Sequence, residues 1–209
     1  VLRACRQQTS HETTVTGASA VLAVIMNNYM TAQEDMWLMA INKVKSPTVF
    51  MLHGFLGSGK TTFARHLEHK YTALRFTHDE WMQQLYGIDP PQANFADYAQ
   101  RVFNVMEPLW TRCVELNNNV ILDFGFWSRE ERVRVREIIT AHNGQAVLCR
   151  LSCPDDIAWE RIQKRNKTPT NSLYIARETF YLLHERFEPL TPDEDFTEVS
   201  DNGSCRYMQ

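Results

Sequence analysis

The sequence predicts an α/β fold in which a mostly parallel sheet carries helices on both faces. From residue 47 onward, short apolar runs alternate with segments whose apolar residues recur every three or four positions, the pattern of strands joined by helical crossovers. The first apolar run leads straight into a glycine-rich stretch and then a helical segment. With 209 residues, 44% hydrophobic and 22% charged, the chain can bury one well-formed core.

The individual elements follow from these runs and from their turn signals. The predicted strands are residues 48–53, 73–77, 119–123 and 145–151, with 196–199 as a possible fifth. The predicted helices are residues 60–69, 79–86, 95–116, 129–141, 154–165 and 172–187. Gly87 ends the second helix, and Pro108 is expected to interrupt or bend the third.

Residues 1–45 lack clear periodicity and are expected to form a disordered or helical N-terminal extension ahead of a domain at 46–209. The apolar segment 18–26 is too short to span a bilayer, and no small-residue cleavage pattern after it supports a signal peptide. The five cysteines are odd in number and lack C-x-x-C spacing. Reduced thiols in a cytoplasmic protein are therefore favoured over a metal or redox site.

The most specific motif follows the first strand and has the form G-x-x-x-x-G-K-[ST]. Its members, with the following threonine, are expected to bind the nucleotide: Gly54, Phe55, Leu56, Gly57, Ser58, Gly59, Lys60, Thr61 and Thr62. Glycines let backbone N–H groups turn toward phosphate oxygens, the lysine reaches the outer phosphates, and the Thr61 hydroxyl ligates Mg²⁺. The helix behind the motif directs its positive end at the same phosphates.

Ligands of such folds bind beyond the carboxyl ends of the strands, so the residues after each strand are candidates. Asp79 follows the second strand, where a carboxylate would face the γ-phosphate and accept a proton from an attacking hydroxyl. Asp79 could equally be the N-cap of its helix. Trp81 is a candidate contact for the acceptor.

Asp123 ends the third strand in a Walker-B-like pattern and is predicted to hold Mg²⁺ together with Thr61. Phe124, Phe126 and Trp127 come next, as core residues or as a wall of the acceptor pocket. Arg129 and Arg132 begin a charged helix, which is either a solvated face or a contact for a substrate anion.

Four cations lie in the segment after the fourth strand: Arg161, Lys164, Arg165 and Lys167. Arg161 and Arg165 are four residues apart and share a helix face. The segment is either a solvated helix end or a lid, placed around residues 161–172, whose arginines stabilise charge on a transferring phosphoryl group.

Together these motifs resemble the P-loop kinase group that includes polynucleotide 5′-hydroxyl kinases, chloramphenicol phosphotransferase and zeta toxins. They look most like its small bacterial AAA family ATPases. The resemblance covers residues 47–200 and rests on the following matches: 54–61, Asp79, 122–127, the Arg161-x-x-x-Arg165-Asn166 lid and 186–189. It implies a three-layer P-loop NTPase fold with a five-stranded sheet of order 2-3-1-4-5. It further implies ATP and Mg²⁺ as cosubstrates and Asp79 as the catalytic base.

Two classes of function remain. The first is an ATP-dependent kinase acting on a hydroxyl of a small molecule or a nucleic acid end, with Lys60, Asp79, Arg161 and Arg165 as catalytic residues. The second is an ATPase or nucleotide switch acting on a protein partner. The net charge of −3 and the absence of an arginine close after Asp79 disfavour nucleic acid as the acceptor. A monomer or homodimer without membrane attachment is expected.

Overall fold

The computed structural model describes residues 46–167, 173–199 and 205–207. The expected extension at 1–45 lies outside the described residues, as does the 168–172 part of the expected lid. The described residues all belong to one unit, Ser46–Gln209.

A six-stranded sheet forms the centre of this unit, with the strand order β2-β3-β1-β4-β5-β6. The strands are β1 (Thr48–His53), β2 (Leu74–Thr77), β3 (Val120–Gly125), β4 (Gln145–Leu151), β5 (Thr197–Val199) and β6 (Cys205–Tyr207). β1 to β5 pair in parallel, whereas β6 pairs antiparallel with β5. The predicted order 2-3-1-4-5 is therefore confirmed, and the three-residue edge strand β6 is an addition that the sequence did not predict.

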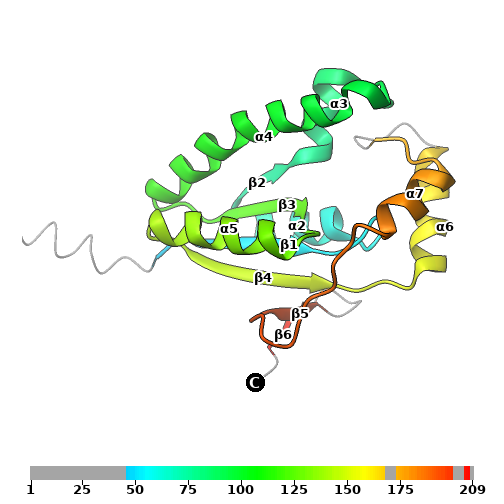
Figure 1. Ribbon diagram of the computed structural model, residues 1–209. Helices are drawn as coiled ribbons and strands as arrows, with labels where there is room; N and C mark the ends of the chain where they lie inside the picture. The colour runs from blue at the N-terminus through cyan, green and yellow to red at the C-terminus, as the bar shows by residue number, and fades with distance from the viewer. Residues whose placement is uncertain (1–45, 168–172, 200–204, 208–209) are drawn as a thin grey trace, which may run out of the picture. The chain divides into compact units, whose positions relative to one another are not determined.

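Helices cover both faces of the sheet, as expected (Figure 1). They are α2 (Lys60–Tyr71), α3 (His78–Tyr86), α4 (Gln92–Glu115), α5 (Arg129–Ala141), α6 (Asp155–Asn166) and α7 (Arg177–His184). Alternate residues of the strands face opposite layers: Met51 and Leu122 join the core under α4 and α5, while Leu52 and Ile121 join the core under α2. α6 and α7 lie beyond the carboxyl ends of the strands (Figure 1).

Two predicted helices differ from the observed ones. α4 continues through Pro108 without interruption, because Met106 and Trp110 on either side of it are anchored in the core. α7 begins at Arg177 rather than at residue 172. Residues 173–176 instead form an extended segment, since the Asn166 side chain bonds the backbone of Ile175 and the Tyr174 N–H donates to Ile88 O at 2.8 Å.

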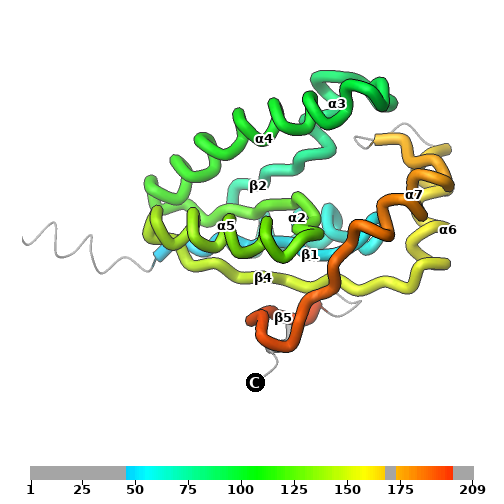
Figure 2. Tube along the Cα trace, viewed as in Figure 1, coloured from blue at the N-terminus to red at the C-terminus, as the bar shows by residue number. Residues whose placement is uncertain are grey.

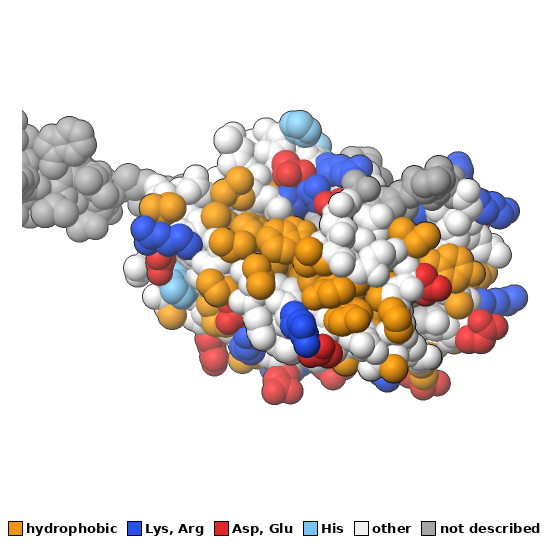
Figure 3. All heavy atoms as spheres, turned by 90° about the horizontal axis from the view of Figure 1, so that it is seen from above, with side chains coloured by type: hydrophobic (Ala, Val, Ile, Leu, Met, Phe, Trp, Pro, Cys, Tyr) orange, Lys and Arg blue, Asp and Glu red, His pale blue; other side chains and the backbone are white. Residues whose placement is uncertain are grey.

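The outer side of α4 exposes Val105 and Leu109, and its C-cap Leu116 is exposed as well. Hydrophobic side chains gather on the face that carries this helix (Figure 3). Among the described helices, none is both long enough and apolar enough to cross a membrane.

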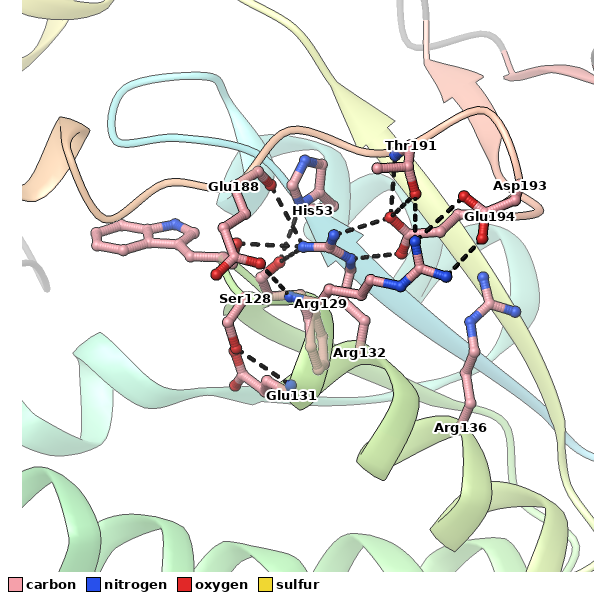
Figure 4. A network of polar contacts seen from close by, with 12 residues as sticks. His53, Ser128, Arg129, Glu131, Arg132, Arg136, Glu188, Thr191, Asp193 and Glu194 are labelled. Atoms are coloured by element: carbon pink, nitrogen blue, oxygen red, sulfur yellow. Dashed lines mark hydrogen bonds and ion pairs between the residues drawn. The ribbon is translucent and has the colours of Figure 1, made fainter.

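The segment between α7 and β5 passes the start of α5 on its way to the sheet (Figure 2). A buried ion pair ties it there: Arg132, 1% exposed, donates to both carboxylate oxygens of Glu194 at 2.7 and 2.9 Å (Figure 4). The remaining guanidinium nitrogen donates to Phe126 O at 3.1 Å. Arg132 thus joins the segment between α7 and β5 to the loop that follows β3.

His53, at the end of β1, contacts the same loop. Its Nδ1 lies 3.0 Å from Phe126 O, and its ring stacks on Phe187 with centroids 4.9 Å apart. Burial lowers the pKa of His53 to about 4, so the ring is neutral at physiological pH. Because a carbonyl only accepts, Nδ1 carries the proton and donates it to Phe126.

Glu194→Ala is expected to destabilise the protein by about 3–5 kcal/mol, because it leaves the buried Arg132 without its partner. Asp193→Ala is the matched control: Asp193 pairs with Arg129, but the two side chains are 61% and 48% exposed, so the loss should stay below about 1 kcal/mol. Urea denaturation of both variants measures the difference, and equal losses would contradict the assignment.

The stability that the Arg132–Glu194 pair contributes depends on pH. Hydrogen bonds from Arg132 hold the pKa of Glu194 at about 2, below the usual glutamate value of about 4.3. The contribution of the pair is therefore full above the unfolded-state pKa and is lost as the pH falls toward 2. The gap in stability between the wild type and Glu194→Ala should narrow over that acidic range.

Candidate functional site

The glycine-rich loop lies between β1 and α2, at the carboxyl edge of the sheet. Gly57 has φ +75°, and a Cβ atom there would lie 2.5 Å from the backbone oxygen of Ala158. No side chain fits at this position, since the loop backbone runs directly against α6. The loop ends at Gly59, which is the N-cap of α2. Backbone N–H groups at the start of α2 are thereby left free to bind an anion.

The loop after β3 supports the glycine-rich loop from the side. The Gly54 N–H donates to Gly125 O, and Trp127 Nε1 donates to Gly54 O, both at 3.2 Å. Phe55 packs between Trp127 and Phe187, each with a ring-centroid distance of 5.5 Å. Trp127 therefore braces the loop, and its predicted contact with an acceptor stays a prediction.

Lys60 and Thr61 occupy the first turn of α2. Lys60 Nζ folds back and donates to Phe55 O at 2.9 Å. The Thr61 hydroxyl donates to Asp123 Oδ2 at 2.7 Å, so the structure brings together the two predicted metal ligands. Both side chains share the α2 side of the sheet, because Asp123 follows Ile121 in the alternation of β3. Thr62, the next residue, is exposed.

The pKa shifts of Asp123 and Lys60 are those expected at a site that binds a cation. Burial, together with the charge of Asp79, raises the pKa of Asp123 against the opposing effect of Lys60. Burial also lowers the pKa of Lys60, although Asp123 and Asp79 oppose it. A divalent cation beside Asp123 would favour its charged form. Carboxylate and hydroxyl oxygens are the ligands that Mg²⁺ prefers.

Asp79 lies in the first turn of α3, one residue inside the helix whose N-cap is Thr77; it is not the N-cap itself. Its side chain is 51% exposed. Partial burial alone would raise the pKa of Asp79, but the positive charges nearby, among them Lys60 and Arg165, lower it overall. The carboxylate is therefore charged at neutral pH. Glu80 is unlike it, because Arg75 holds Glu80 in an ion pair at 3.0 Å.

The two predicted lid arginines differ in their surroundings. Arg161 is exposed and donates to Gly57 O at 3.2 Å and to Cys153 Sγ at 3.4 Å. Arg165 is half-buried, near enough to Asp79 that this carboxylate raises the arginine pKa, while burial lowers it overall. One guanidinium nitrogen of Arg165 reaches Leu173 O at 3.5 Å.

Two buried side-chain polar atoms have no hydrogen-bond partner within the described parts of the chain: Ser58 Oγ and Arg165 Nε. Buried polar groups are normally paired, and each unpaired one costs about 1–3 kcal/mol. One of these atoms belongs to the glycine-rich loop and the other to α6. A bound phosphate chain offers acceptors for such donors, so the residues present fit a nucleotide.

Other predicted residues lie further from this centre. Trp81 is half-buried and packs against the core beneath α4. The Arg129 guanidinium is engaged by Thr191 and Asp193 (Figure 4), so the structure gives it a link to the C-terminal segment rather than a free anion contact. Arg132 is neither solvated nor free for a substrate, because it is buried against Glu194. Phe126 is fully buried and belongs to the core.

Several supporting residues were missed from the sequence. Glu194 lies 62 positions from Arg132, and no local pattern in a single sequence links the two. Glu188 stood in a segment that the resemblance includes, and its N–H donates to Trp127 O at 3.0 Å. The role of Glu188 as a strut for this loop, however, needed the fold.

Solved structures with related folds share low sequence identity with this chain. A protein of the Pnkp1/Rnl/Hen1 RNA repair complex has a TM-score of 0.58 and 20% identity over 69% of this chain and 45% of that chain, so the match spans less than half of that protein. Chaetomium thermophilum Kti12, solved with ADP-AlF3, has a TM-score of 0.54 and 18% sequence identity; the match covers 69% of this chain and 82% of Kti12. A gluconokinase from Sinorhizobium meliloti has a TM-score of 0.52 and 13% sequence identity; the match covers 74% of this chain and 83% of the gluconokinase.

No curated protein is significantly similar in sequence to this chain. A family model described as an AAA domain, by contrast, matches residues 49–190, which is more than half of the chain and includes every element from β1 to α7. The glycine-rich loop and the Thr61–Asp123 pair both fall inside this match, and the chain belongs to this AAA domain family.

Proposed function

We propose that the protein is an ATP-dependent kinase that transfers the γ-phosphoryl group of ATP to a hydroxyl acceptor. The observation that carries the proposal is the convergence of Lys60, Asp79 and Asp123 at the carboxyl ends of three adjacent parallel strands. The charges of Asp123 and Asp79 both act on the pKa of Lys60, and the charges of Lys60 and Asp79 both act on the pKa of Asp123. Phosphoryl transfer depends on positioning and charge stabilisation, and this arrangement can supply both.

Each residue has a distinct part in the proposed transfer. The glycine-rich loop and Lys60 hold the phosphates, and Thr61 and Asp123 would hold Mg²⁺. When bound, that ion neutralises charge on the phosphate oxygens. Asp79 accepts the proton of the acceptor hydroxyl and orients it toward the phosphorus. Arg165 faces the same space from α6 and offsets the negative charge that develops there.

The cationic surroundings of Asp79 explain why it suits this part. A carboxylate with a lowered pKa is a weak base, but it stays charged and can orient a hydroxyl at every physiological pH. Arg161 differs from Arg165, because it holds the backbone of the phosphate loop and is exposed. We therefore assign charge stabilisation mainly to Arg165, and loop closure to Arg161.

The alternative is an ATPase or switch module that acts on a protein partner. Such a module would need the phosphate loop and the Thr61–Asp123 pair but no base beside the γ-phosphate. The position of Asp79 favours the kinase. For the acceptor, small molecules are favoured over nucleic acid, because α3 carries Trp81 and Met82 where a phosphate-binding arginine would be expected.

The experiment that tests the proposal is a screen with γ-labelled ATP against nucleic acid 5′ ends, aminoglycosides, phenicols, nucleosides and sugar nucleotides. Label on one acceptor class is the expected result. Asp79→Asn should then lower transfer by about 10²–10⁴-fold, with the Kd for ATP within about twofold. Label that appears only as free phosphate would support the ATPase module, and full transfer by Asp79→Asn would remove Asp79 as the base.

Lys60→Ala is expected to weaken ATP binding by about 10- to 100-fold, because a charge-assisted hydrogen bond contributes roughly 1.5–3 kcal/mol. Lys70→Ala is the control, since Lys70 is exposed at the far end of the same helix. Calorimetric titration with ATP measures both. Unchanged affinity in Lys60→Ala would overturn the phosphate-loop assignment.

Arg165→Ala is expected to lower the turnover number by about 10³-fold, the lower end of what a transition-state arginine contributes. Lys164→Ala removes a cation from the neighbouring, exposed position of α6 and should change turnover by less than about twofold. Steady-state kinetics of both variants decide between a lid arginine and a solvated helix end, which would give equal, small effects.

A further inference from the structure

The imidazole of His78 is buried directly beside the proposed base. His78 is the first residue of α3 and is 8% exposed. Its ring stacks on Phe103 of α4 with centroids 4.2 Å apart, and Phe103 in turn meets Phe124 edge-on at 5.3 Å. A histidine clamped between helices in this way has one fixed orientation.

That orientation determines which ring nitrogen carries the proton. Nε2 lies 3.3 Å from the backbone oxygen of Ala99. A carbonyl only accepts, so this contact is a hydrogen bond when Nε2 is protonated. In the neutral ring, Nδ1 is then left with a lone pair. Nδ1 lies 3.8 Å from Asp79 Oδ1, so the free acceptor of His78 faces the carboxylate to which we assign proton abstraction.

Charged groups lie near His78 on its own helix, α3, and on α5. Asp79 faces it from α3, and Glu131 approaches from α5. Burial raises the pKa of Glu131, and the charges of Arg134 and His78 oppose that change. The contacts of α4 with the ring are uncharged, a carbonyl and a phenyl group. His78 therefore lies between the carboxyl groups of Asp79 and Glu131.

We propose that His78 is a positioning residue that receives the acceptor proton from Asp79. The inference rests on the proposed kinase function. As the acceptor O–H bond breaks, its proton moves to Asp79, the new O–P bond forms and the P–O bond to ADP breaks. The proton then passes from Asp79 to Nδ1 of His78, leaving an imidazolium and a carboxylate, and water removes it to restore the neutral ring.

This step explains how a weakly basic carboxylate completes each turnover. With its pKa lowered, Asp79 holds the abstracted proton poorly, and the lone pair on Nδ1 of His78 beside it can accept that proton. The side chain of Asp79 is half-exposed and can rotate to bring its oxygen from 3.8 Å to hydrogen-bond distance.

The kinetic test compares His78→Gln with His66→Gln, a change of an exposed histidine on α2. Glutamine keeps an N–H that can donate to Ala99 O but has no basic nitrogen. In His78→Gln the turnover number should fall by about tenfold or more, while the KM for ATP stays within about twofold. The acidic decline of the turnover number between about pH 5 and 8, where histidines titrate, should disappear. An unchanged turnover number, or an equal loss at every pH, would overturn the inference.

A second measurement does not depend on transfer activity. Two-bond ¹H–¹⁵N spectra of the full chain should show the neutral His78 ring protonated at Nε2, and Asp79→Asn should shift its Nδ1 resonance. A ring protonated at Nδ1, or an Nδ1 signal that ignores Asp79→Asn, would refute the arrangement. If the wild type transfers phosphate to no acceptor, the proposed function fails; if it does and His78→Gln matches it, only the role of His78 fails.

Discussion

The parallel pairing of β1 with β3 is the constraint on which the rest of the site depends. The register places His53 opposite Gly125, so the glycine-rich loop and the loop after β3 leave the sheet side by side. The Gly54–Gly125 and Trp127–Gly54 hydrogen bonds can form only from that start. Arg132 and Glu194 then hold the second loop from behind. The shape of the glycine-rich loop is thus fixed in part by residues that lie outside it.

The fold and the centre of the site followed from local signals, and the supports did not. Apolar runs and the G-x-x-x-x-G-K-T string are contiguous, so a single sequence displays them and predicts the five parallel strands. The sheet order then placed Thr61 beside Asp123. Residues 173–176 do not continue the predicted helix, because the hydrogen bonds of their backbone with the Asn166 side chain and with Ile88 O outweigh helix propensity. Arg132 looked like a surface residue, since its partner comes from the distant C-terminal segment.

The two arginines Arg161 and Arg165 of α6 have different surroundings and therefore different proposed roles. Arg161 and Arg165 are one turn of α6 apart and share a helix face. Arg161 donates to the backbone of the glycine-rich loop, whereas Arg165 interacts electrostatically with Asp79. A guanidinium already bonded to Gly57 O has fewer donors to offer a phosphoryl group. The unpaired buried Nε of Arg165 could instead donate without breaking an existing bond, which is the preorganised state that the proposed charge stabilisation would require.

The pKa values of the two carboxylates, Asp123 and Asp79, are shifted in opposite directions, and this difference separates their proposed roles. Asp123 is 5% exposed and its pKa is raised, so it becomes fully charged when a cation arrives. Asp79 is half-exposed among cations and its pKa is lowered, so it is charged before any ligand binds. In the proposed kinase, the α2 side of the sheet would therefore take the cation, and the start of α3 would be left to the acceptor hydroxyl.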